Sequence, residues 1–398
     1  MPATQAMDQP ELDGVDDERI ARARALAPRI REAADEIESL RRLPDELARA
    51  MSEAELFRLY APRAYGGPQV DPLTALRVVE EISRADGSAG WVAMLGSGVS
   101  EFAGCMDAET AAAMLDEVGP FDTAGSARLL TTAEAVEGGY ILTGRWDFQS
   151  GITHARRMVG NCLVTDGGEQ RRDERGPVTR YCFIPVRDGE VIDVWHTVGM
   201  RGTGSNDFAV DGLFVPEQRT FHMLDRPGVE GPLYRTRFKG PFGCVMTAAN
   251  SLGIARGALD EFGVLAASRG STGSSTALRD RPYVQTKTAE AEAIVRSARA
   301  YLVGATREAC AVAKDPAQEP AAALVDLRLA IVHAMHESVK AVDLLFHAAG
   351  TNAVYTKHRL ERCFRDVHVG VQHAAAVPAH YETAGRQLLG LEADVPGW

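Results

Sequence analysis

The stretch GYILTGRWDFQSG, residues 139–151, decides how the rest of the chain is interpreted. Apolar and polar residues largely alternate along it, and β-branched and aromatic side chains are frequent, which is typical of a β-strand. Similar short runs recur between residues 121 and 225, where glycine, aspartate and proline residues separate them. Several short strands joined by such turns predict a small β-sandwich or barrel in the middle of the chain.

On both sides of this strand-rich region the apolar period becomes that of α-helices. Upstream, apolar residues from Ile20 to Leu40 recur at helical spacing, and charged residues fill the opposite face. Downstream, residues 286–311 and 321–349 form two long alanine-rich segments, and short links between long helices suggest an antiparallel bundle. We therefore predict three regions, namely a helical domain (1–118), a β-barrel domain (119–228) and a helical bundle (229–398).

The composition excludes several classes of partner. The 398 residues carry a net charge of −12 and a pI near 5.4, which argues against nucleic acid or an anionic membrane, because phosphates attract a basic face. The N-terminus has no apolar run typical of a signal peptide, and five charged residues interrupt residues 321–350, so no membrane span is expected. Six scattered cysteines without a CxxC pair indicate no zinc site and favour reduced core residues in the cytoplasm.

Four motifs, in this order and spacing, resemble the acyl-CoA dehydrogenase superfamily over nearly the whole chain. They are PRAYGG (62–67), the stretch 139–151, VGMRGTGSND (198–207) followed by LFVP (213–216), and AAGT (348–351) followed by Arg-Asp at 365–366. The resemblance implies a mainly α fold with a central β domain: an N-terminal helical domain, a middle β-barrel and a C-terminal four-helix bundle. It also implies a homotetramer that is a dimer of dimers.

Within that superfamily, two strings resemble the branch of two-component flavin-dependent monooxygenases (group D) more closely than the dehydrogenases. They are WDFQSG (146–151) with His154-Ala155, and GMRGTGS (199–205). The resemblance implies a hydroxylase that uses reduced FMN or FADH₂ and O₂ through a flavin C4a-hydroperoxide to act on a small molecule. No GxGxxG motif opens a βαβ unit, so no NAD(P)H site is predicted, and a separate flavin reductase must supply the electrons.

The dehydrogenases of the superfamily need a carboxylate base beside the flavin, and this sequence has none where the resemblance would put it. Counting from Asp366 leads to His373, and the other usual stretch, RFKGPFGC (237–244), contains no acid. Glu382 follows about two helical turns too late. We therefore expect an imidazole, with no acidic side chain near it, at the flavin edge. An imidazole that titrates near neutrality suits proton transfer in hydroxylation, although a lone histidine is more often a hydrogen-bonded core residue.

Ser150 is the second predicted catalytic residue. In the resembling enzymes the matching serine hydrogen-bonds flavin N5, and a serine hydroxyl both donates and accepts. The alternative interpretation is an ordinary turn serine before Gly151.

The resemblance also implies a set of cofactor contacts, each with a structural alternative. Trp146 and Phe148 are either flavin contacts or barrel core, and Trp195 matches a tryptophan beside the flavin. Arg269 matches an arginine that reaches the flavin phosphate of a neighbouring subunit, or is an ordinary solvated arginine. Gly350 and Thr351 match a turn near the partner's cofactor, although a glycine at a helix end needs no function to explain it.

The sequence does not identify the substrate. Phenol hydroxylases of the branch carry a histidine in the helix read here as GWVAMLGSGV (90–99), which has none, and the small residues 96–98 stand there instead. That substitution leaves room for a bulky aromatic ring of the polyketide or indole type, or for an amino sugar. The hypotheses are therefore an aromatic hydroxylase, an N-oxygenase of an amino sugar or amine, an acyl-CoA dehydrogenase, and a non-catalytic relative with the same fold.

Overall fold

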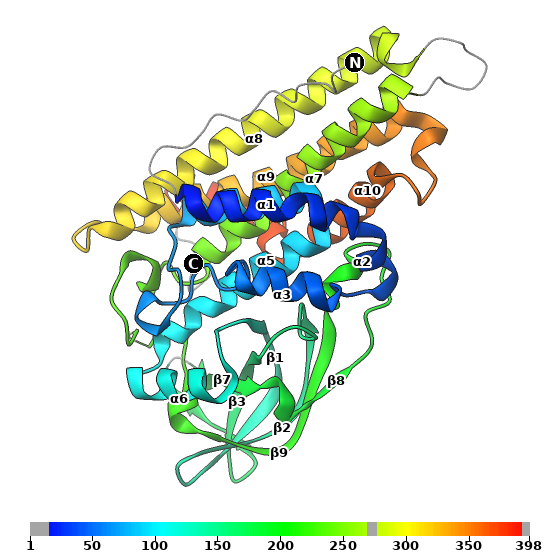
Figure 1. Cartoon of the computed structure of the whole chain (residues 1–398). Helices are drawn as coiled ribbons and strands as arrows, with labels where there is room; N and C mark the ends of the chain where they lie inside the picture. The colour runs from blue at the N-terminus through cyan, green and yellow to red at the C-terminus, as the bar shows by residue number, and fades with distance from the viewer. Residues whose placement is uncertain (1–15, 175, 226, 269–276, 392–398) are drawn as a thin grey trace.

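The computed structural model describes residues 16–174, 176–225, 227–268 and 277–391. In these residues, six α-helices come first, then the strands, then five more α-helices. Figure 1 shows the strands below and the long C-terminal helices above. The N-terminal helices are α1 (Asp17–Glu32), α2 (Ala34–Leu40), α3 (Asp45–Glu53), α4 (Pro72–Ala85), α5 (Gly87–Ser100) and α6 (Ala108–Val118). The C-terminal helices are α7 (Pro241–Ser268), α8 (Pro282–Lys314), α9 (Ala321–Ala349), α10 (Arg359–Gly370) and α11 (Ala379–Leu388).

Two adjacent helices, α4 and α5, bring the N-terminal region against the bundle. Each begins at an aspartate whose carboxylate accepts backbone N–H groups of the first turn: Asp71 before α4 and Asp86 before α5. Gly90 of α5 and Gly253 of α7 both lie against Ser83 of α4, where an added Cβ would come within 2.0 Å and 2.5 Å of its side chain. Glycine at these two positions therefore allows α4, α5 and α7 to pack closely.

The strands are β1 (Thr123–Val136), β2 (Gly139–Gln149), β3 (Arg157–Asp166), β4 (Glu169–Gln170), β5 (Arg172–Asp173), β6 (Gly176–Pro177), β7 (Thr179–Pro185), β8 (Glu190–Ile192), β9 (Asn206–Pro216) and β10 (Thr220–Phe221). Eight of them form one sheet in the order β10-β7-β3-β1-β2-β9-β8, with β4 added beside β3. In the described part of the chain, β10 and β8 are the first and last strands in this order. All pairs along it are antiparallel except β1 with β3.

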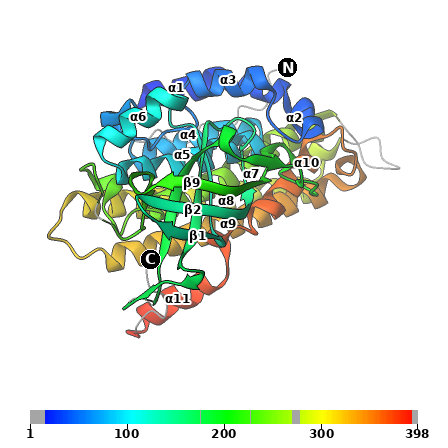
Figure 2. The ribbon, with the colours of Figure 1, turned by 90° about the horizontal axis from the view of Figure 1, so that it is seen from below.

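The core has three parts. One apolar cluster joins the N-terminal helices to the C-terminal bundle, a second lies among the strands, and a third fills the space between α6 and the sheet. In Figure 1 the long helices α7, α8 and α9 lie above, the sheet lies below, and α5 runs between them. Seen from below in Figure 2, β1, β2 and β9 cross the centre, with α3 and α6 along one edge and α11 along the other.

The predicted architecture is confirmed: helices, then a central β region, then helices. The predicted strand at 139–151 is β2, and the predicted helices at 286–311 and 321–349 lie within α8 and α9. None of the described helices is long and apolar enough to cross a membrane. The last N-terminal helix ends at Val118, the strands occupy residues 123–221, and α7 begins at Pro241.

Candidate active site

A mainly apolar cavity of about 710 Å³ lies where the three regions meet. Its wall takes Trp91 and Gly98 from α5, Ser150 from the turn after β2, and Trp195 from the segment before β9. The start of α7 and the residues just after α10, including His373, close it on the other side. A concave, mostly apolar site of this size with a few polar groups is what a small ligand or cofactor requires.

The end of β2 is bent so that Ser150 faces this cavity. The pairing of β2 with β9 shifts register between Trp146 and Gln149, and Phe148 adopts a left-handed conformation with φ of 56°. The backbone N–H of Ser150 donates to the carbonyl of Phe148 at 2.9 Å, and that of Gly151 donates to the carbonyl of Thr203. A left-handed aromatic residue is strained, so its presence beside a cavity is typical of a functional site.

Three buried hydroxyl groups form a chain that fixes which way Ser150 directs its proton. Thr203 Oγ1 donates to the carbonyl of Met200 at 2.9 Å, so it accepts the proton of Ser205 Oγ at 2.6 Å. Ser205 then accepts from Ser150 Oγ at 2.6 Å, because each hydroxyl has only one proton. Ser150 therefore offers a lone pair, and not a proton, toward the cavity.

Trp91 connects the two predicted catalytic residues. Its Nε1 donates to Ser150 Oγ at 3.2 Å, and its ring lies edge-on to the His373 imidazole with centroids 5.5 Å apart. The sequence reasoning missed this tryptophan, which lies in the same segment, 90–99, that was searched for a histidine. Gly98 of that segment lines the cavity, whereas Gly96 packs against the Phe57 backbone and Ser97 bonds to Leu59 N. The extra room expected from residues 96–98 therefore comes from Gly98.

The environment of His373 sets both its tautomer and its pKa. Its Nδ1 accepts a hydrogen bond from the backbone N–H of Ala375 at 3.1 Å, so the neutral ring carries its proton on Nε2. Burial lowers the pKa of His373 to about 4. Burial therefore contradicts the expectation of an imidazole that titrates near neutrality: the ring is a neutral Nε2–H donor at pH 7.

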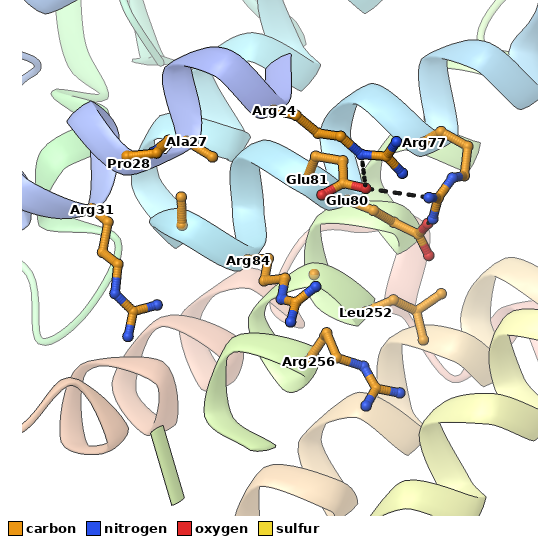
Figure 3. A pocket seen from close by; sticks show the side chains of 12 residues that line it. Arg24, Ala27, Pro28, Arg31, Arg77, Glu80, Glu81, Arg84, Leu252 and Arg256 are labelled. Carbon is orange, nitrogen blue, oxygen red and sulfur yellow. Dashed lines mark hydrogen bonds and ion pairs between the residues drawn. The ribbon is translucent and has the colours of Figure 1, made fainter. Parts of the chain in front are cut away.

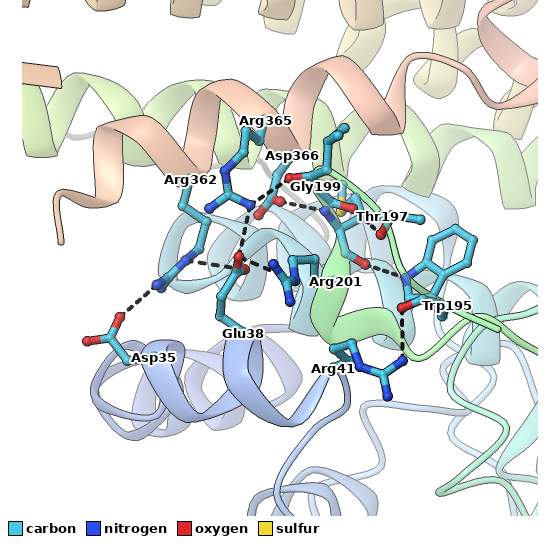
Figure 4. A network of polar contacts seen from close by, with 12 residues as sticks. Asp35, Glu38, Arg41, Trp195, Thr197, Gly199, Arg201, Arg362, Arg365 and Asp366 are labelled. Atoms are coloured by element: carbon cyan, nitrogen blue, oxygen red, sulfur yellow. Dashed lines mark hydrogen bonds and ion pairs between the residues drawn. The ribbon is translucent and has the colours of Figure 1, made fainter. Parts of the chain in front are cut away.

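Trp195 stands at the cavity wall on a segment that several polar contacts hold, as Figure 4 shows. Its indole Nε1 donates to the carbonyl of Met200 at 2.8 Å, and the guanidinium of Arg41 donates to the backbone carbonyl of Trp195 at 3.2 Å. The ring meets Phe148, also predicted to contact the cofactor, with centroids 5.9 Å apart at 79°. The structure therefore brings together Ser150, Phe148, Trp195 and His373 around one cavity.

A buried carboxyl on α10, that of Asp366, holds the segment between Trp195 and Met200 in place. Asp366 Oδ1 accepts the backbone N–H of Met200 at 2.6 Å, and Arg365 donates to the carbonyl of Val198 at 2.7 Å. Met200 has φ of 51°, so this contact stabilises a left-handed residue. Burial, and next the nearby Asp86, raise the pKa of Asp366 to about 7. The Arg-Asp pair singled out in the sequence thus positions Trp195.

The remaining predicted contacts lie elsewhere. Trp146 is fully buried in the sheet core, where its Nε1 donates to the carbonyl of Asn161 and its ring stacks on Phe208. The structure thus gives Trp146 the alternative role, that of core residue. Gly350 and Thr351 are exposed at the end of α9 and do not line the cavity of this chain. Arg269 lies outside the described residues.

A carboxyl that the sequence reasoning did not anticipate also lines the cavity. Glu101 begins the short 3₁₀ turn after α5 (Glu101–Cys105) and is 1% exposed. The sequence analysis expects no acidic side chain near the imidazole; Glu101 lines the same cavity but lies ten residues beyond Trp91, the residue that contacts His373. A sequence signal existed: Glu101 is the only charged residue between Gly87 and Met106. Glu382, by contrast, is exposed on α11.

The cavity walls fit a flat heteroaromatic ring such as the isoalloxazine of a flavin. Gly98 of α5 and Gly243 of α7 both line the cavity and lie close together, since a Cβ on Gly98 would be 3.8 Å from the Gly243 Cα, so neither position puts a side chain into the space. The free lone pair of Ser150 suits the N–H of a reduced flavin. Ser150, Phe148 and Trp195 are the residues that would hold such a ring.

A second cavity, shown in Figure 3, has a different character. It measures about 580 Å³, lies between α1, α4 and α7, and is lined by several arginines and two glutamates. Its arginines are engaged in ion pairs: Arg24 with Glu81, Arg77 with Glu80 and Glu81, Arg84 with Asp260, and Arg256 with Glu292. It contains none of the predicted site residues.

Comparison with known proteins agrees with this geometry. Residues 19–119 match the family described as the acyl-CoA dehydrogenase N-terminal domain, and residues 245–378 match the acyl-CoA dehydrogenase C-terminal domain. Indole-3-acetate monooxygenase of Pseudomonas putida is 32% identical, over 91% of each chain. The flavin-dependent monooxygenase oxygenase subunit HsaA of Rhodococcus jostii is 32% identical, over 89% of this chain and 93% of that one.

Solved structures extend the comparison to the fold. The 3-HSA hydroxylase of Rhodococcus sp. RHA1 superposes with a TM-score of 0.84 at 30% identity, covering 94% of this chain and 97% of that one. XiaF of Streptomyces, solved with FADH₂ and glycerol, gives 0.85 at 28% identity over 96% and 97%. The chain therefore belongs to the acyl-CoA dehydrogenase superfamily. Within it, the chain belongs to the branch of two-component flavin-dependent monooxygenases, as an oxygenase component.

Proposed function

We propose that this chain hydroxylates a neutral aromatic small molecule, using O₂ and reduced FMN or FADH₂ that a separate flavin reductase supplies. One observation carries the proposal: Ser150 and His373 line the same apolar cavity and contact the same indole, that of Trp91. A bound reduced flavin supplies the two electrons that let one oxygen atom of O₂ enter the substrate while the other leaves as water.

The protein side chains have separate tasks in this proposal. Ser150 accepts a hydrogen bond from the flavin N–H through the lone pair that Trp91 and Ser205 leave free. His373 would donate a hydrogen bond from its Nε2–H where oxygen is reduced, and the proton that the oxygen takes up comes from the substrate or solvent. The apolar wall excludes water, which limits the loss of reducing equivalents as H₂O₂.

The substrate class follows from the cavity and from the relatives. Relatives are named for action on indole-3-acetate and on resorcinol, both aromatic. The wall next to the predicted flavin contacts is formed by aromatic rings and glycines, which suit a flat ring. Among the described residues that line the cavity, Glu101 is the one carboxyl, and burial raises its pKa to about 8. A protonated carboxyl is not the base that thioester oxidation needs, which disfavours a dehydrogenase.

The test supplies the purified chain with FMNH₂ or FADH₂ from a generic reductase and with ¹⁸O₂. A panel of indoles, phenols and naphthols is screened by mass spectrometry. We expect a mass increase of one ¹⁸O atom in at least one aromatic compound. No ¹⁸O incorporation, together with anaerobic bleaching of bound FAD by an acyl-CoA, would establish a dehydrogenase instead.

The assembly and its location complete the proposal. We propose a homotetramer in the cytoplasm. Large apolar side chains are exposed before the start of α10 and at the end of α11, including Tyr355, Leu388 and Leu389, and burial against another copy would remove them from water. The six cysteines are free thiols, which suits a reducing compartment. Light scattering of the purified chain measures the oligomeric state, and a monomer would contradict this part.

A further inference from the structure

Glu101 has a buried oxygen atom without a partner at the wall of the active-site cavity. Its Oε1 accepts the backbone N–H of Gly240 at 2.8 Å, whereas no hydrogen bond to Oε2 is found among the described residues. The side chain is 1% exposed and lines the cavity. Buried polar atoms almost always have a hydrogen-bond partner, so an unsatisfied one beside a binding cavity points to a ligand atom.

The groups around Glu101 do not supply that partner. Lys239, whose charge favours the ionised form of Glu101, directs its Nζ to the carbonyl of Asp225 at 3.1 Å and to the sulfur of Cys105 at 3.7 Å. On the helical side, the hydroxyl of Tyr60 donates to the carbonyl of Phe242 at 3.2 Å, and that of Tyr234 donates to the carbonyl of Tyr60 at 3.0 Å.

The protonation states around Glu101 follow from burial. Burial raises the pKa of Glu101 to about 8, against the opposing effects of the Gly240 N–H and of Lys239. The neighbouring thiols stay protonated, because burial raises the pKa of Cys105 to about 11 and that of Cys244 to about 12. At neutral pH, Oε2 therefore presents mainly an O–H donor.

Helix α5 separates Glu101 from the predicted oxygenation chemistry. Trp91, Met94, Leu95 and Gly98 line the cavity at helical spacing, and Glu101 continues the same stripe just beyond the helix. Trp91 contacts Ser150 and His373, and Glu101 lies ten residues farther along the chain. A rise of 1.5 Å per residue puts the two ends of this stripe roughly 15 Å apart. A ligand that spans the cavity can therefore react at one end and be held at the other.

We propose that Glu101 positions the substrate, by donating a hydrogen bond from Oε2 to a carbonyl or hydroxyl oxygen of a neutral aromatic molecule. This inference rests on the proposed function and specifies its substrate: an apolar ring system with one oxygen acceptor remote from the carbon that is hydroxylated. A cationic amine is excluded as the preferred ligand, because it has no acceptor for the O–H.

The test compares ligands that differ only in an acceptor. The probes are indole and 4-, 5- and 6-formylindole, whose carbonyl accepts but does not donate at that position, and tryptamine as the cation. Dissociation constants are measured by calorimetry on the flavin-loaded chain, without turnover. We expect one formylindole to bind the wild type about tenfold more tightly than indole, the value of one net hydrogen bond.

Two variants identify the group responsible. Glu101→Leu should remove the tenfold preference without weakening the binding of indole. Glu101→Gln should keep it, because the amide offers N–H donors in the same place. As the pH rises from 7 to 9, the preference should fall in the wild type, whose carboxyl ionises, and stay constant in Glu101→Gln. Glu169→Gln, an exposed glutamate on β4, is the matched control and should behave as wild type.

The outcomes separate this inference from the proposed function. No preference for any formylindole in the wild type, a preference that survives in Glu101→Leu, or tighter Glu101-dependent binding of tryptamine would each overturn it. If the wild type incorporates ¹⁸O but shows one of these results, the inference alone fails. If the preference holds but no compound is oxygenated, the proposed function alone fails. Should Glu101→Leu not fold, Glu101→Gln and the pH dependence decide.

Discussion

The indole Nε1 of Trp91 donates to Ser150 Oγ at 3.2 Å, which ties helix α5 to the turn after β2. The hydroxyl of Ser150 donates its hydrogen bond to Ser205 Oγ, so the indole N–H occupies one lone pair of Ser150 and the other is left for the cavity. The same indole meets His373 edge-on. Trp91, from the N-terminal helices, thus orients Ser150 of the sheet region and packs against His373 of the C-terminal helical region.

Replacing Trp91 by phenylalanine tests this link. The ring beside His373 is kept, while the donor to Ser150 is lost, so Ser150 is free to rotate. We expect more H₂O₂ and less product per reduced flavin consumed, and a loss of about 1 kcal/mol of stability for the missing hydrogen bond. Catalase-sensitive oxygen uptake measures the H₂O₂. Unchanged coupling would mean that the bond does not orient the serine.

Ser150→Ala and Ser205→Ala separate a direct contact from an indirect one. Ser150→Ala removes the lone pair offered to the flavin, so we expect weaker binding of reduced flavin, by about tenfold, and mostly H₂O₂ as product. Ser205→Ala leaves Ser150 in place but frees its proton, so the effect should be smaller. Anaerobic titration with reduced FMN measures both affinities. Equal losses in the two variants would argue against a direct role of Ser150.

His373→Ala should lower product formation by about 10²-fold while oxygen is still consumed, as expected when a positioned group that supports proton transfer is lost. His347→Ala, an exposed histidine on α9, is the control. The ratio of product to flavin oxidised, by chromatography, is the measurement. A His373→Ala enzyme that couples normally would remove this residue from the mechanism.

The pH dependence of coupling follows from the environment of His373. Burial lowers its pKa to about 4, so its charge does not change between pH 6 and 8. We expect product per flavin to show no inflection near pH 6.5 in the wild type, and to fall only as the pH approaches 4, where protonation of Nδ1 breaks its hydrogen bond with the N–H of Ala375 and charges the ring. An inflection near 6.5 that disappears in His373→Ala would contradict the neutral-donor assignment.

Asp366→Asn tests the anchor behind Trp195. Burial raises the pKa of Asp366 to about 7, above its value in the unfolded chain, so the folded state binds the extra proton and loses stability as the pH rises from about 4 to 7. Asparagine keeps the acceptor for Met200 N and does not titrate. Relative to wild type, the variant should therefore gain stability between pH 5 and pH 8, on the order of 2 kcal/mol. Thermal unfolding of the wild type and of Asp366→Asn at pH 5 and pH 8 measures the difference in stability. A difference that does not change with pH would argue against the raised pKa of Asp366.

Much of the fold followed from the sequence because its signals are local. The alternation in residues 139–149 and the long apolar periods of residues 286–311 and 321–349 each correspond to one element of the structure. Ser150 and His373, predicted only through the spacing of motifs in a resembling family, both line the cavity. Trp146 shows what the motif alone does not predict. Trp146 and Ser150 belong to the same motif, but Trp146 is buried in the sheet core, whereas Ser150 follows the register shift and lines the cavity.

Relations between distant segments were not predictable. The role of Trp91 depends on two partners that lie 59 and 282 residues away along the chain, and no periodicity encodes such contacts. Glu101 had a signal, a lone charge in a long uncharged stretch, but an unpaired Oε2 is visible only once the backbone of Gly240 is in place. The low pKa of His373 likewise arises from burial, which depends on how separate elements pack and cannot be predicted from local sequence.

The cavity draws its wall from α5, from the turn after β2 and from the residues beyond α10, so it is a property of the docked molecule and of no single region. No excised fragment would retain a reaction chamber. To transfer the specificity of a relative to this chain, all three segments that line the cavity would have to be exchanged together. Exchanging one of them alone would place it against residues with which it does not pack.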